Sequence, residues 1–507
     1  MSEARPLLAM RGISKSFGDM RANDDVDLTL EHGEVLGLLG ENGAGKTTLM
    51  NILFGIYGAD AGDIAIDGRA VAIDGPADAL AHGVGMVHQH FHLVPRHSVL
   101  ENLLVGEKGR GGRLDRTRAR RRLDEIGRRY GLVLDGERLV STLTVGEQQR
   151  LEIVKALFRG ARILILDEPT SVLTPQESEG LFAAIRAMAA AGVGVVFISH
   201  KLNEVRAITD RIAVMRQGAM VAVIDDVAAV DNRRLAELMC GHALAPPVKR
   251  PTECGRVLLR LDSVSAAGGA GRPNALDGVS LELRGGEIVG VAGVSGNGQR
   301  ELAEVIAGIV APVSGRIEVD GKAVERPTPR TMQALGVADI PEDRMGAGLL
   351  TTLPLSDSMV LPRAGQAPFS RFGVLRPAAI RAFVAERIER FGIKAAGADV
   401  RTGTLSGGNL QKALLARELA WDPLVLVAAQ PTRGLDVAAR EFVHSQFLDL
   451  RARGRGVLLI SEDLEELFDI CDRIAVMFAG RIVAVLDAAE ADVARVGLLM
   501  TGVQEAA

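Results

Sequence analysis

Residues 40–47 read Gly-Glu-Asn-Gly-Ala-Gly-Lys-Thr, and this stretch decides the fold. It matches the pattern GxxxxGK[ST] after an apolar strand and before a helical segment at residues 47–54, which is the context that a phosphate-binding loop requires. The glycines allow backbone N–H groups to close around phosphates, with Lys46 on the β/γ oxygens and Thr47 on Mg²⁺. The residues predicted to bind the nucleotide here are Gly40, Asn42, Gly43, Gly45, Lys46, Thr47 and Thr48.

Paired carboxylates end a second apolar segment, residues 162–168. Two acids at the tip of a buried strand repel each other, so the strand itself has no need of them. A bound metal ion and an activated water would explain why both are present. We expect Asp167 to hold Mg²⁺ through water and Glu168 to polarise the attacking water. A further strand, residues 193–198, leads to His200, which is predicted to hold the γ-phosphate and the water in line.

Two more side chains complete the predicted set. Gln89 lies on another strand-end loop and is predicted to take part in catalysis and in Mg²⁺ binding. Phe17 precedes the phosphate loop, and its ring is predicted to stack on adenine, a contact worth about 1–3 kcal/mol by analogy with base stacking elsewhere. A core position is the alternative for Phe17.

The chain repeats itself, which predicts two domains. Residues 34–40 return at 287–293, and residues 211–215 (Arg-Ile-Ala-Val-Met) return unchanged at 473–477. Strands alternate with helical segments in each copy, a pattern typical of a mostly parallel α/β sheet. A helical subdomain is expected at about 95–155 in the first copy and 350–418 in the second. The predicted boundaries are 1–245, a Pro-containing linker at 246–256, and 257–507.

Composition excludes several classes. The chain has 507 residues, is 47% hydrophobic and carries a net charge of −5, which argues against a disordered protein and against a dedicated nucleic-acid binder. No apolar run approaches the roughly 18 residues that span a bilayer, and no signal peptide is expected. Cys240, Cys254 and Cys471 form no CxxC pair, so we expect reduced thiols and no zinc module.

Residues 405–412 read Leu-Ser-Gly-Gly-Asn-Leu-Gln-Lys, and with them the chain resembles the ATP-binding cassette (ABC) superfamily over nearly its whole length. The resemblance implies two tandem P-loop NTPase domains, each with a RecA-like α/β core, an antiparallel β portion and a helical subdomain. It also implies that this signature loop of one cassette closes over the ATP held by the other. The second-copy residues assigned to ATP by this resemblance are Ser406, Gly407, Gly408, Asn409 and Asp436.

The two copies depart from the family pattern in opposite ways. In the second copy Gln299 and Arg300 replace the lysine and threonine of the phosphate loop, and Ala429-Gln430 replaces the acid pair. In the first copy the signature reads Thr-Val-Gly-Glu at residues 144–147. Because cassettes pair head to tail in this superfamily, one composite site combines the sound elements of both copies, and the other collects the defects. We expect hydrolysis at one site only.

Within the superfamily the chain is similar to ATPase subunits of bacterial importers for simple sugars and nucleosides, with residues 86–91 and 428–436 closer to the nucleoside branch. The resemblance implies two permease subunits, an extracytoplasmic solute-binding protein and a peripheral place on the cytoplasmic face of the membrane. The loops after Gln89 and Glu342 would receive the permease. The alternatives are a soluble twin-cassette ATPase acting on ribosomes or nucleic acid, a drug-export ATPase and a non-enzymatic scaffold.

Overall fold

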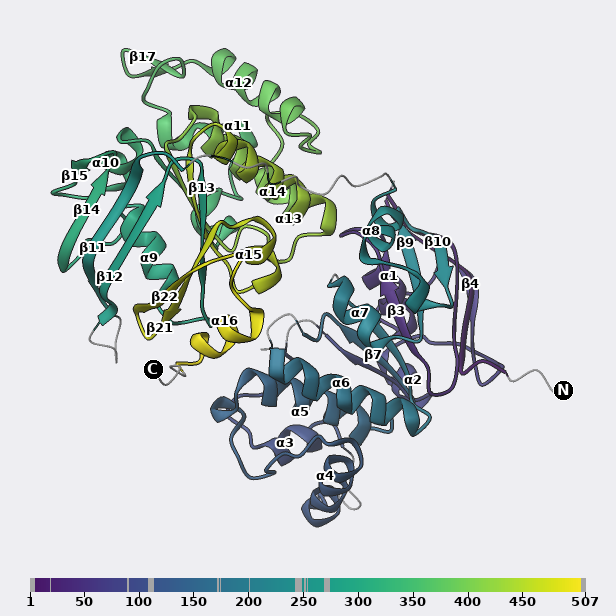
Figure 1. Ribbon diagram of the computed structural model, residues 1–507. Helices are drawn as coiled ribbons and strands as arrows, with labels where there is room; N and C mark the ends of the chain where they lie inside the picture. The colour runs from purple at the N-terminus through teal and green to yellow at the C-terminus, as the bar shows by residue number, and fades with distance from the viewer. Residues whose placement is uncertain are drawn as a thin grey trace. The chain divides into compact units, whose positions relative to one another are not determined.

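The computed structural model describes residues 5–18, 20–88, 91–107, 114–170, 173, 175–199, 201–241, 249, 252, 254–268 and 274–502. The chain divides into two compact units, Met1–Leu244 and Ala245–Ala507 (Figure 1). Within the described residues no helix combines the length and the apolar character needed to cross a bilayer.

A six-stranded sheet forms the centre of the first unit, in the order β10-β9-β3-β8-β7-β6. All neighbours are parallel except the β9–β10 pair, so most strands end at the same edge. The parallel strands are almost wholly buried because helices cover both faces. The bounds are β3 (Val35–Leu39), β6 (Val84–Val87), β7 (Ile163–Asp167), β8 (Gly194–Ile198), β9 (Arg211–Arg216) and β10 (Ala219–Ile224).

A second, antiparallel sheet has the order β2-β1-β4-β5. One hydrophobic core joins it to the central sheet, and helix α1 (Lys46–Leu53) contributes Leu49, Met50 and Leu53 to that core. The phosphate loop that precedes α1 is therefore fixed between two sheets. The strand bounds are β1 (Leu8–Phe17), β2 (Met20–Leu30), β4 (Ala61–Ile66) and β5 (Arg69–Val71).

The remaining helices of the first unit include a helical subdomain inserted between β6 and β7. It contains α3 (Val99–Leu104), α4 (Arg116–Tyr130) and α5 (Val145–Phe158). The amphipathic α4 buries Leu123 and Ile126 and exposes most of its arginines. The other helices are α2 (Pro76–Ala81), α6 (Pro175–Ala190), α7 (Leu202–Ile208) and α8 (Asn232–Cys240).

The second unit repeats this plan, with sheets β16-β19-β20-β13-β21-β22 and β12-β11-β14-β15. Alternate residues of its central strands enter two different cores: Leu426 packs on one face of the sheet and Val427 on the other. The central strands are β13 (Glu287–Ala292), β16 (Val337–Ile340), β19 (Val425–Ala429), β20 (Gly456–Ile460), β21 (Arg473–Phe478) and β22 (Arg481–Asp487). The antiparallel strands are β11 (Val257–Ala267), β12 (Asn274–Arg284), β14 (Ser314–Val319) and β15 (Lys322–Ala323).

Helices of the second unit occupy equivalent places, and a short hairpin is added before α12. Each unit combines a mostly parallel sheet and its covering helices with a second, antiparallel sheet, and this confirms the predicted fold class. The bounds are α9 (Gln299–Ile306), α10 (Pro329–Ala334), α11 (Leu355–Val360), α12 (Pro377–Arg390), α13 (Gly407–Glu418), α14 (Val437–Ala452), α15 (Leu464–Ile470) and α16 (Val493–Met500), with the hairpin strands β17 (Ser370–Arg371) and β18 (Val374–Leu375).

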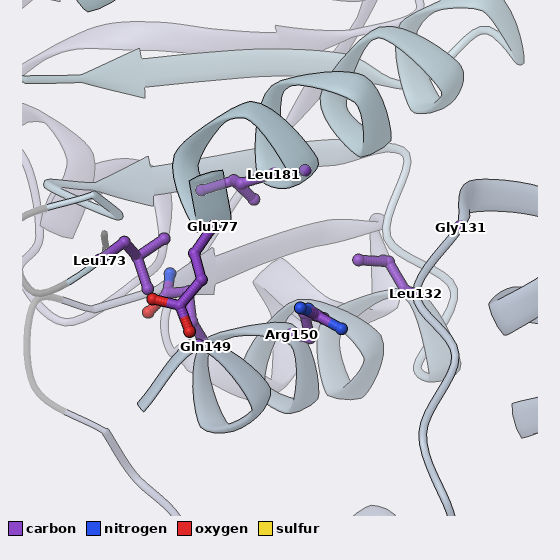
Figure 2. A pocket seen from close by; sticks show the side chains of 9 residues that line it. Gly131, Leu132, Gln149, Arg150, Leu173, Glu177 and Leu181 are labelled. Atoms are coloured by element: carbon purple, nitrogen blue, oxygen red, sulfur yellow. The ribbon is translucent and has the colours of Figure 1, made fainter. Parts of the chain in front are cut away.

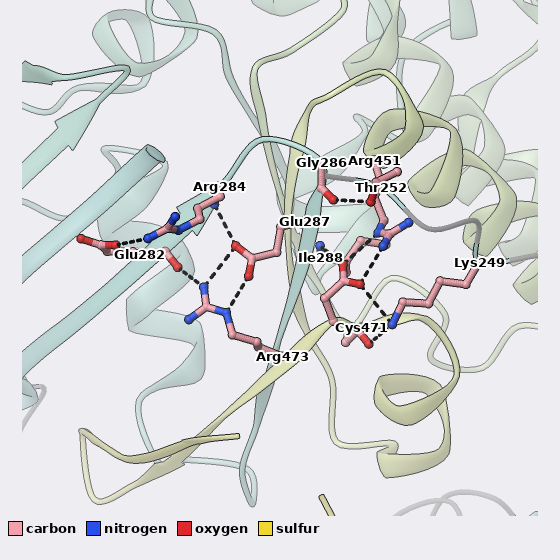
Figure 3. Close-up of polar contacts among 11 residues, drawn as sticks. Lys249, Thr252, Glu282, Arg284, Gly286, Glu287, Ile288, Arg451, Cys471 and Arg473 are labelled. Atoms are coloured by element: carbon pink, nitrogen blue, oxygen red, sulfur yellow. Dashed lines mark hydrogen bonds and ion pairs between the residues drawn. The ribbon is translucent and has the colours of Figure 1, made fainter. Parts of the chain in front are cut away.

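An arginine–glutamate pair anchors the repeated segments in both units. Arg211 Nε lies 2.8 Å from Glu34 Oε1, and Arg473 Nε lies 2.6 Å from Glu287 Oε1. Figure 3 shows the second of these pairs beside two residues of the predicted linker. Lys249 Nζ lies 3.2 Å from Asp472 Oδ1, and the Thr252 hydroxyl donates to the Gly286 carbonyl at 2.9 Å, so these linker residues are attached to the second unit.

Candidate functional site

The phosphate loop of the first unit adopts a conformation that only glycine tolerates at its key points. Gly40 and Gly45 have φ values of 155° and 100°. A Cβ on Gly40 would lie 2.4 Å from the Met215 carbonyl oxygen, and one on Gly45 would lie 2.3 Å from that of Ala22. The loop is thus pressed against β9 and β2, and its backbone is shaped before any ligand arrives.

Lys46 lies at the first turn of α1 and folds over the loop. Its Nζ donates to the carbonyls of Gly40 at 2.7 Å and Glu41 at 2.9 Å. These bonds hold an ammonium group at a helix N-terminus, where the helix dipole also favours an anion. Thr47 is exposed and Thr48 is half-buried in the same turn, and Asn42 and Gly43 are exposed. This arrangement can receive phosphate oxygens.

The acid pair lies at the carboxyl end of β7. Burial raises the pKa of Asp167 to about 6, with the charge of Glu168 adding to the rise and that of Lys46 opposing it. Glu168 itself has a left-handed φ of 49°, and its N–H donates to the Ile198 carbonyl at 2.9 Å. The turn directs the chain away from the strand immediately after the acid pair, at the same sheet edge as the phosphate loop.

The oxygen donors at this edge fit Mg²⁺. Mg²⁺ is commonly held by one or two protein oxygens together with substrate phosphates and water. Asp167 supplies a carboxylate and Thr47 an exposed hydroxyl. Among the described residues no cluster of three or more His, Cys, Asp or Glu side chains could hold a metal without such a substrate.

Phe17 lies at the end of β1 and is 41% exposed, so it is not a core residue. Tyr57, which follows α1, packs its ring edge-on against Phe17 with centroids 5.2 Å apart. The two rings form an exposed aromatic platform near the phosphate loop's helix. Sequence reasoning identified Phe17 but not Tyr57, because the contact between the two rings depends on how β1 and α1 pack in the fold.

Gln89 and His200, two of the predicted catalytic residues, lie outside the described residues. Ser199, which immediately precedes His200, is buried, and its hydroxyl accepts the N–H of Lys201 at 3.1 Å. The strand that leads to His200 therefore ends in a fixed position. The roles of both residues stay predictions.

The phosphate loop of the second unit keeps the backbone shape but is closed by its own side chains. Gly298, the equivalent of Gly45, has a φ of 109°. Gln299, in the place of Lys46, is buried; its amide oxygen accepts the Asn297 N–H at 3.1 Å and its amide nitrogen donates to the Val294 carbonyl at 3.0 Å. The Asn297 N–H is thus bonded within its loop, as the N–H of its first-unit counterpart, Ala44, is to the Glu41 carbonyl at 3.1 Å.

The sheet edge of the second unit also pairs its polar groups internally. Arg300, in the place of Thr47, points to Glu304 at 2.8 Å, and Glu342, in the place of Gln89, accepts from Arg433 at 2.6 Å. Gln430 has the same left-handed φ, 48°, as its counterpart Glu168. The second unit therefore retains the turn but holds neither acid of the pair.

The signature segment of the second unit is an open helix N-terminus. Ser406 is the N-cap of α13 without a side-chain bond to the first turn; its hydroxyl instead accepts from the Asn409 amide at 2.8 Å. Gly407 is exposed, and a Cβ there would meet nothing within 4 Å. Backbone N–H groups at such a terminus are suited to an anion.

In the first unit the N-terminus of the equivalent helix, α5, is capped by side chains of the unit itself. Thr144 and Glu147 form a reciprocal capping box, and Glu147 is paired with Arg138 at 2.5 Å. The Thr144 N–H and Arg138 both lower the pKa of Glu147. Glu177 adds a second carboxylate: a Cβ on Gly146 would lie 2.3 Å from its Oε1.

Figure 2 shows Glu177 directed from α6 toward α5, beside Gln149, at a hollow of about 170 Å³. In the second unit Ala439 stands where Glu177 stands in the first, and a Cβ on Gly408 would lie 3.4 Å from its methyl carbon, an ordinary contact distance. Sequence reasoning missed Glu177 because it is far from the signature in the chain. The first signature is therefore more acidic than its residues 144–147 alone indicate.

Asp436, predicted to contact the nucleotide, is the N-cap of α14, and its Oδ1 accepts the Ala439 N–H at 2.8 Å. The segment before it is tied to a buried carboxylate: Thr432 donates to Glu466 Oε1 at 2.8 Å and Ser461 donates to its Oε2 at 2.6 Å. His444 lies 2.9 Å from the same carboxylate. These bonds fix the segment that carries Asp436.

A sequence model of the family described as ABC transporter matches residues 23–171 and 276–433. The chain is 43% identical to the glucose import ATP-binding protein TsgD13 of Haloferax volcanii, over 98% of this chain and 96% of that protein. It is 40% identical to the nucleoside import ATP-binding protein NupA of Lactococcus lactis, over 98% of both chains. A crystal structure of the archaeal ribosome recycling factor aABCE1, in complex with the ribosomal stalk protein aP1, shares the fold: the TM-score is 0.62 at 21% identity, over 94% of this chain and 90% of that one.

Proposed function

This chain belongs to the ABC transporter family, and from that premise we propose that it is the ATP-hydrolysing subunit of an importer for nucleosides or simple sugars. A difference between the two units supports the finer part of the proposal, which is a single site of ATP hydrolysis. The first unit has a lysine in its phosphate loop beside an acid pair, whereas the second has a buried glutamine in that loop, no acid pair, and a signature helix whose N-cap side chain makes no bond to the first turn. We infer that each unit would supply a different half of one ATP site.

We assign ATP to the first unit's loop, with the second unit's Ser406–Asn409 segment closing over it. Lys46 would neutralise charge on the β and γ phosphates, and the N–H groups of α13 would face the γ-phosphate. The opposite combination would bring the second unit's phosphate loop, with Gln299, to the first unit's signature helix, with Glu147 and Glu177. Two carboxylates at that helix terminus disfavour a triphosphate, which supports a single hydrolytic site.

Hydrolysis follows from the acids at the β7 edge. Glu168 would accept a proton from the attacking water, and His200 would hold that water and the γ-phosphate in line. Asp167, Thr47 and Gln89 would hold Mg²⁺, which neutralises charge that develops on the phosphate oxygens. Phe17, with Tyr57 behind it, would hold adenine by stacking.

The partners would be two integral-membrane permease subunits and an extracytoplasmic solute-binding protein, and the chain would lie on the cytoplasmic face of the membrane. The names of the relatives divide between glucose, ribose, nucleoside and guanosine import. We favour the nucleoside branch because residues 86–91 and 428–436 resemble it. The likeness to a ribosome recycling factor is one of fold alone.

Reconstitution tests this function directly. The chain, its two permease subunits and the binding protein are placed in proteoliposomes, and uptake of labelled guanosine, uridine, ribose and glucose is measured with and without ATP. ATP-dependent uptake of a nucleoside or a sugar, lost in Lys46→Ala, is the expected result. ATP-independent uptake, or a wild-type chain that fails to associate with the permease and pellets with ribosomes, would contradict it.

A further inference from the structure

The hairpin of β17 and β18 carries an unusual tip. Phe372 is 93% exposed, Val374 is 69% exposed and Leu375 is 52% exposed. Figure 1 shows this hairpin at the end of α12, outside the sheets of the second unit. Three neighbouring apolar side chains are thus exposed to water, and a group of this kind indicates an interaction surface.

The backbone conformation at Phe372 is one that an aromatic residue rarely adopts. Phe372 has a φ of 52° and is followed by Gly373 at 78°, so the turn requires two left-handed residues. Asn-Gly is the usual pair in such a turn, and a bulky aromatic is disfavoured there. Phe372 is the one aromatic among the described non-glycine residues with positive φ. Local stability therefore favours another residue, so a requirement outside the fold favours the ring.

The base of the hairpin is rigid. Phe369, directly before β17, is fully buried, and its ring meets Phe383 at 4.9 Å and Trp421 at 5.9 Å between centroids. The Arg376 N–H donates to the Phe369 carbonyl at 2.8 Å and closes the hairpin. The base of the hairpin is therefore anchored, which limits the positions that its exposed tip can take.

The charges around the hairpin indicate the chemistry of its partner. Between Asp357 and Glu386 the sequence contains four arginines and no Asp, Glu or Lys. Arg371 and Arg376 flank the tip, are exposed, and have no carboxylate within ion-pair distance among the described residues. Aromatic residues and arginine are enriched in protein interfaces, where lysine and acids are depleted. The tip thus fits an apolar pocket with an acidic rim.

We propose that the 370–375 hairpin docks into a cytoplasmic pocket of the permease, with Phe372 as the anchor and Arg371 and Arg376 on acidic rim residues. The proposal rests on the proposed function, because that function supplies the integral-membrane partner. It assigns docking to the second cassette's hairpin, in addition to the loop after Glu342. Only two arginines flank the tip, fewer than the clusters of about four to eight basic residues that recognise an anionic lipid surface, so the observations favour a protein pocket.

The test compares two matched variants in the assembled transporter. Tagged chain is co-expressed with its two permease subunits, and the affinity of purified chain for purified permease is measured. Phe372→Asn should keep or raise the melting temperature, because asparagine suits the turn, yet weaken permease binding at least tenfold. Val313→Asn, at an apolar residue of the same unit that is 67% exposed, should bind as wild type does.

A photoreactive benzoylphenylalanine at position 372 should form an adduct with a permease subunit, identified by mass. Wild-type chain that does not bind the permease would overturn the proposed function itself. Normal wild-type binding with equal affinity for Phe372→Asn, or an adduct to no permease subunit, would overturn only the hairpin assignment. Phe372-dependent sedimentation of the isolated chain with phosphatidylglycerol vesicles, and no effect on permease binding, would overturn it in favour of lipid.

Discussion

Replacing Glu168 with glutamine separates catalysis from folding more cleanly than other changes at the site. The second unit already holds a glutamine, Gln430, at the equivalent position, with φ of 48° against 49°. Its N–H donates to Ile460 at 2.8 Å, as that of Glu168 donates to Ile198 at 2.9 Å. The turn therefore accepts glutamine, and Glu168→Gln should fold without strain.

Two magnitudes follow for Glu168→Gln. Loss of a general base lowers turnover by about 10²–10⁴-fold, or about 3–5 kcal/mol of barrier. The rise in the pKa of Asp167 from 3.8 to about 6 means that keeping it ionised at pH 7 costs up to about 3 kcal/mol. Burial accounts for the largest part, and the charge of Glu168 comes next. The variant removes that second part, so its stability should rise by less than about 3 kcal/mol.

The assay combines single-turnover hydrolysis of radiolabelled ATP with thermal melting of the nucleotide-free protein at pH 7. The expected result is a hydrolysis rate at or below about one hundredth of wild type, with ATP retained and a melting temperature that is unchanged or higher. Glu168→Asp is the matched control because it keeps the charge and should keep the wild-type melting temperature. Hydrolysis near the wild-type rate, or a lower melting temperature, would refute the reasoning.

Three further predictions concern other parts of the chain. Asp339, with a buried Oδ1 that has no hydrogen-bond partner, has its pKa raised to about 7 by burial and then by Glu418. The folded state therefore keeps a proton that the unfolded state loses near pH 3.8, so the free energy of unfolding falls as the pH rises from about 4 to about 7. Asp339→Asn carries no charge at any pH, so in melting experiments it should be more stable than wild type at pH 8 by up to about 4 kcal/mol. At pH 4 the two proteins should be similar in stability. Gln430→Glu should leave steady-state ATPase unchanged, because Gln299 and Arg300 still replace the lysine and the threonine of the phosphate loop; an increase would show a second competent site. Phe17→Ala should weaken ATP binding by about 1–3 kcal/mol in a fluorescence titration while leaving the maximal rate within a few-fold, and equal affinity would remove Phe17 from the adenine site.

Motifs that are continuous in the chain were accessible from sequence. The phosphate loop, the strand-end acids and the repeat each depend on residues that are near one another in sequence, so spacing alone indicates them. The family membership and the fold class predicted on this basis are confirmed. The assignment of individual site residues remains a prediction that the proposed experiments test.

Features that depend on distant segments were not accessible. Glu177 reaches Gly146 because α6 packs against α5, and no spacing rule predicts that contact. The sequence shows that Gln299 replaces the lysine of the phosphate loop; its two bonds within the loop depend on the folded backbone. The φ of Phe372 is likewise a property of the turn. Tertiary packing decides which polar groups are already satisfied, and that decides which loop can accept a phosphate.

The central claim is that the first unit's loop and the second unit's signature meet on one triphosphate. Trapping Mg·ADP·vanadate and irradiating the complex cleaves the backbone next to the vanadate, and the fragments can be mapped by mass. Cleavage is expected within 40–47 and within 406–409 of the same chain or of paired chains. Cleavage within 144–147 or 293–300, with none at 406–409, would contradict it.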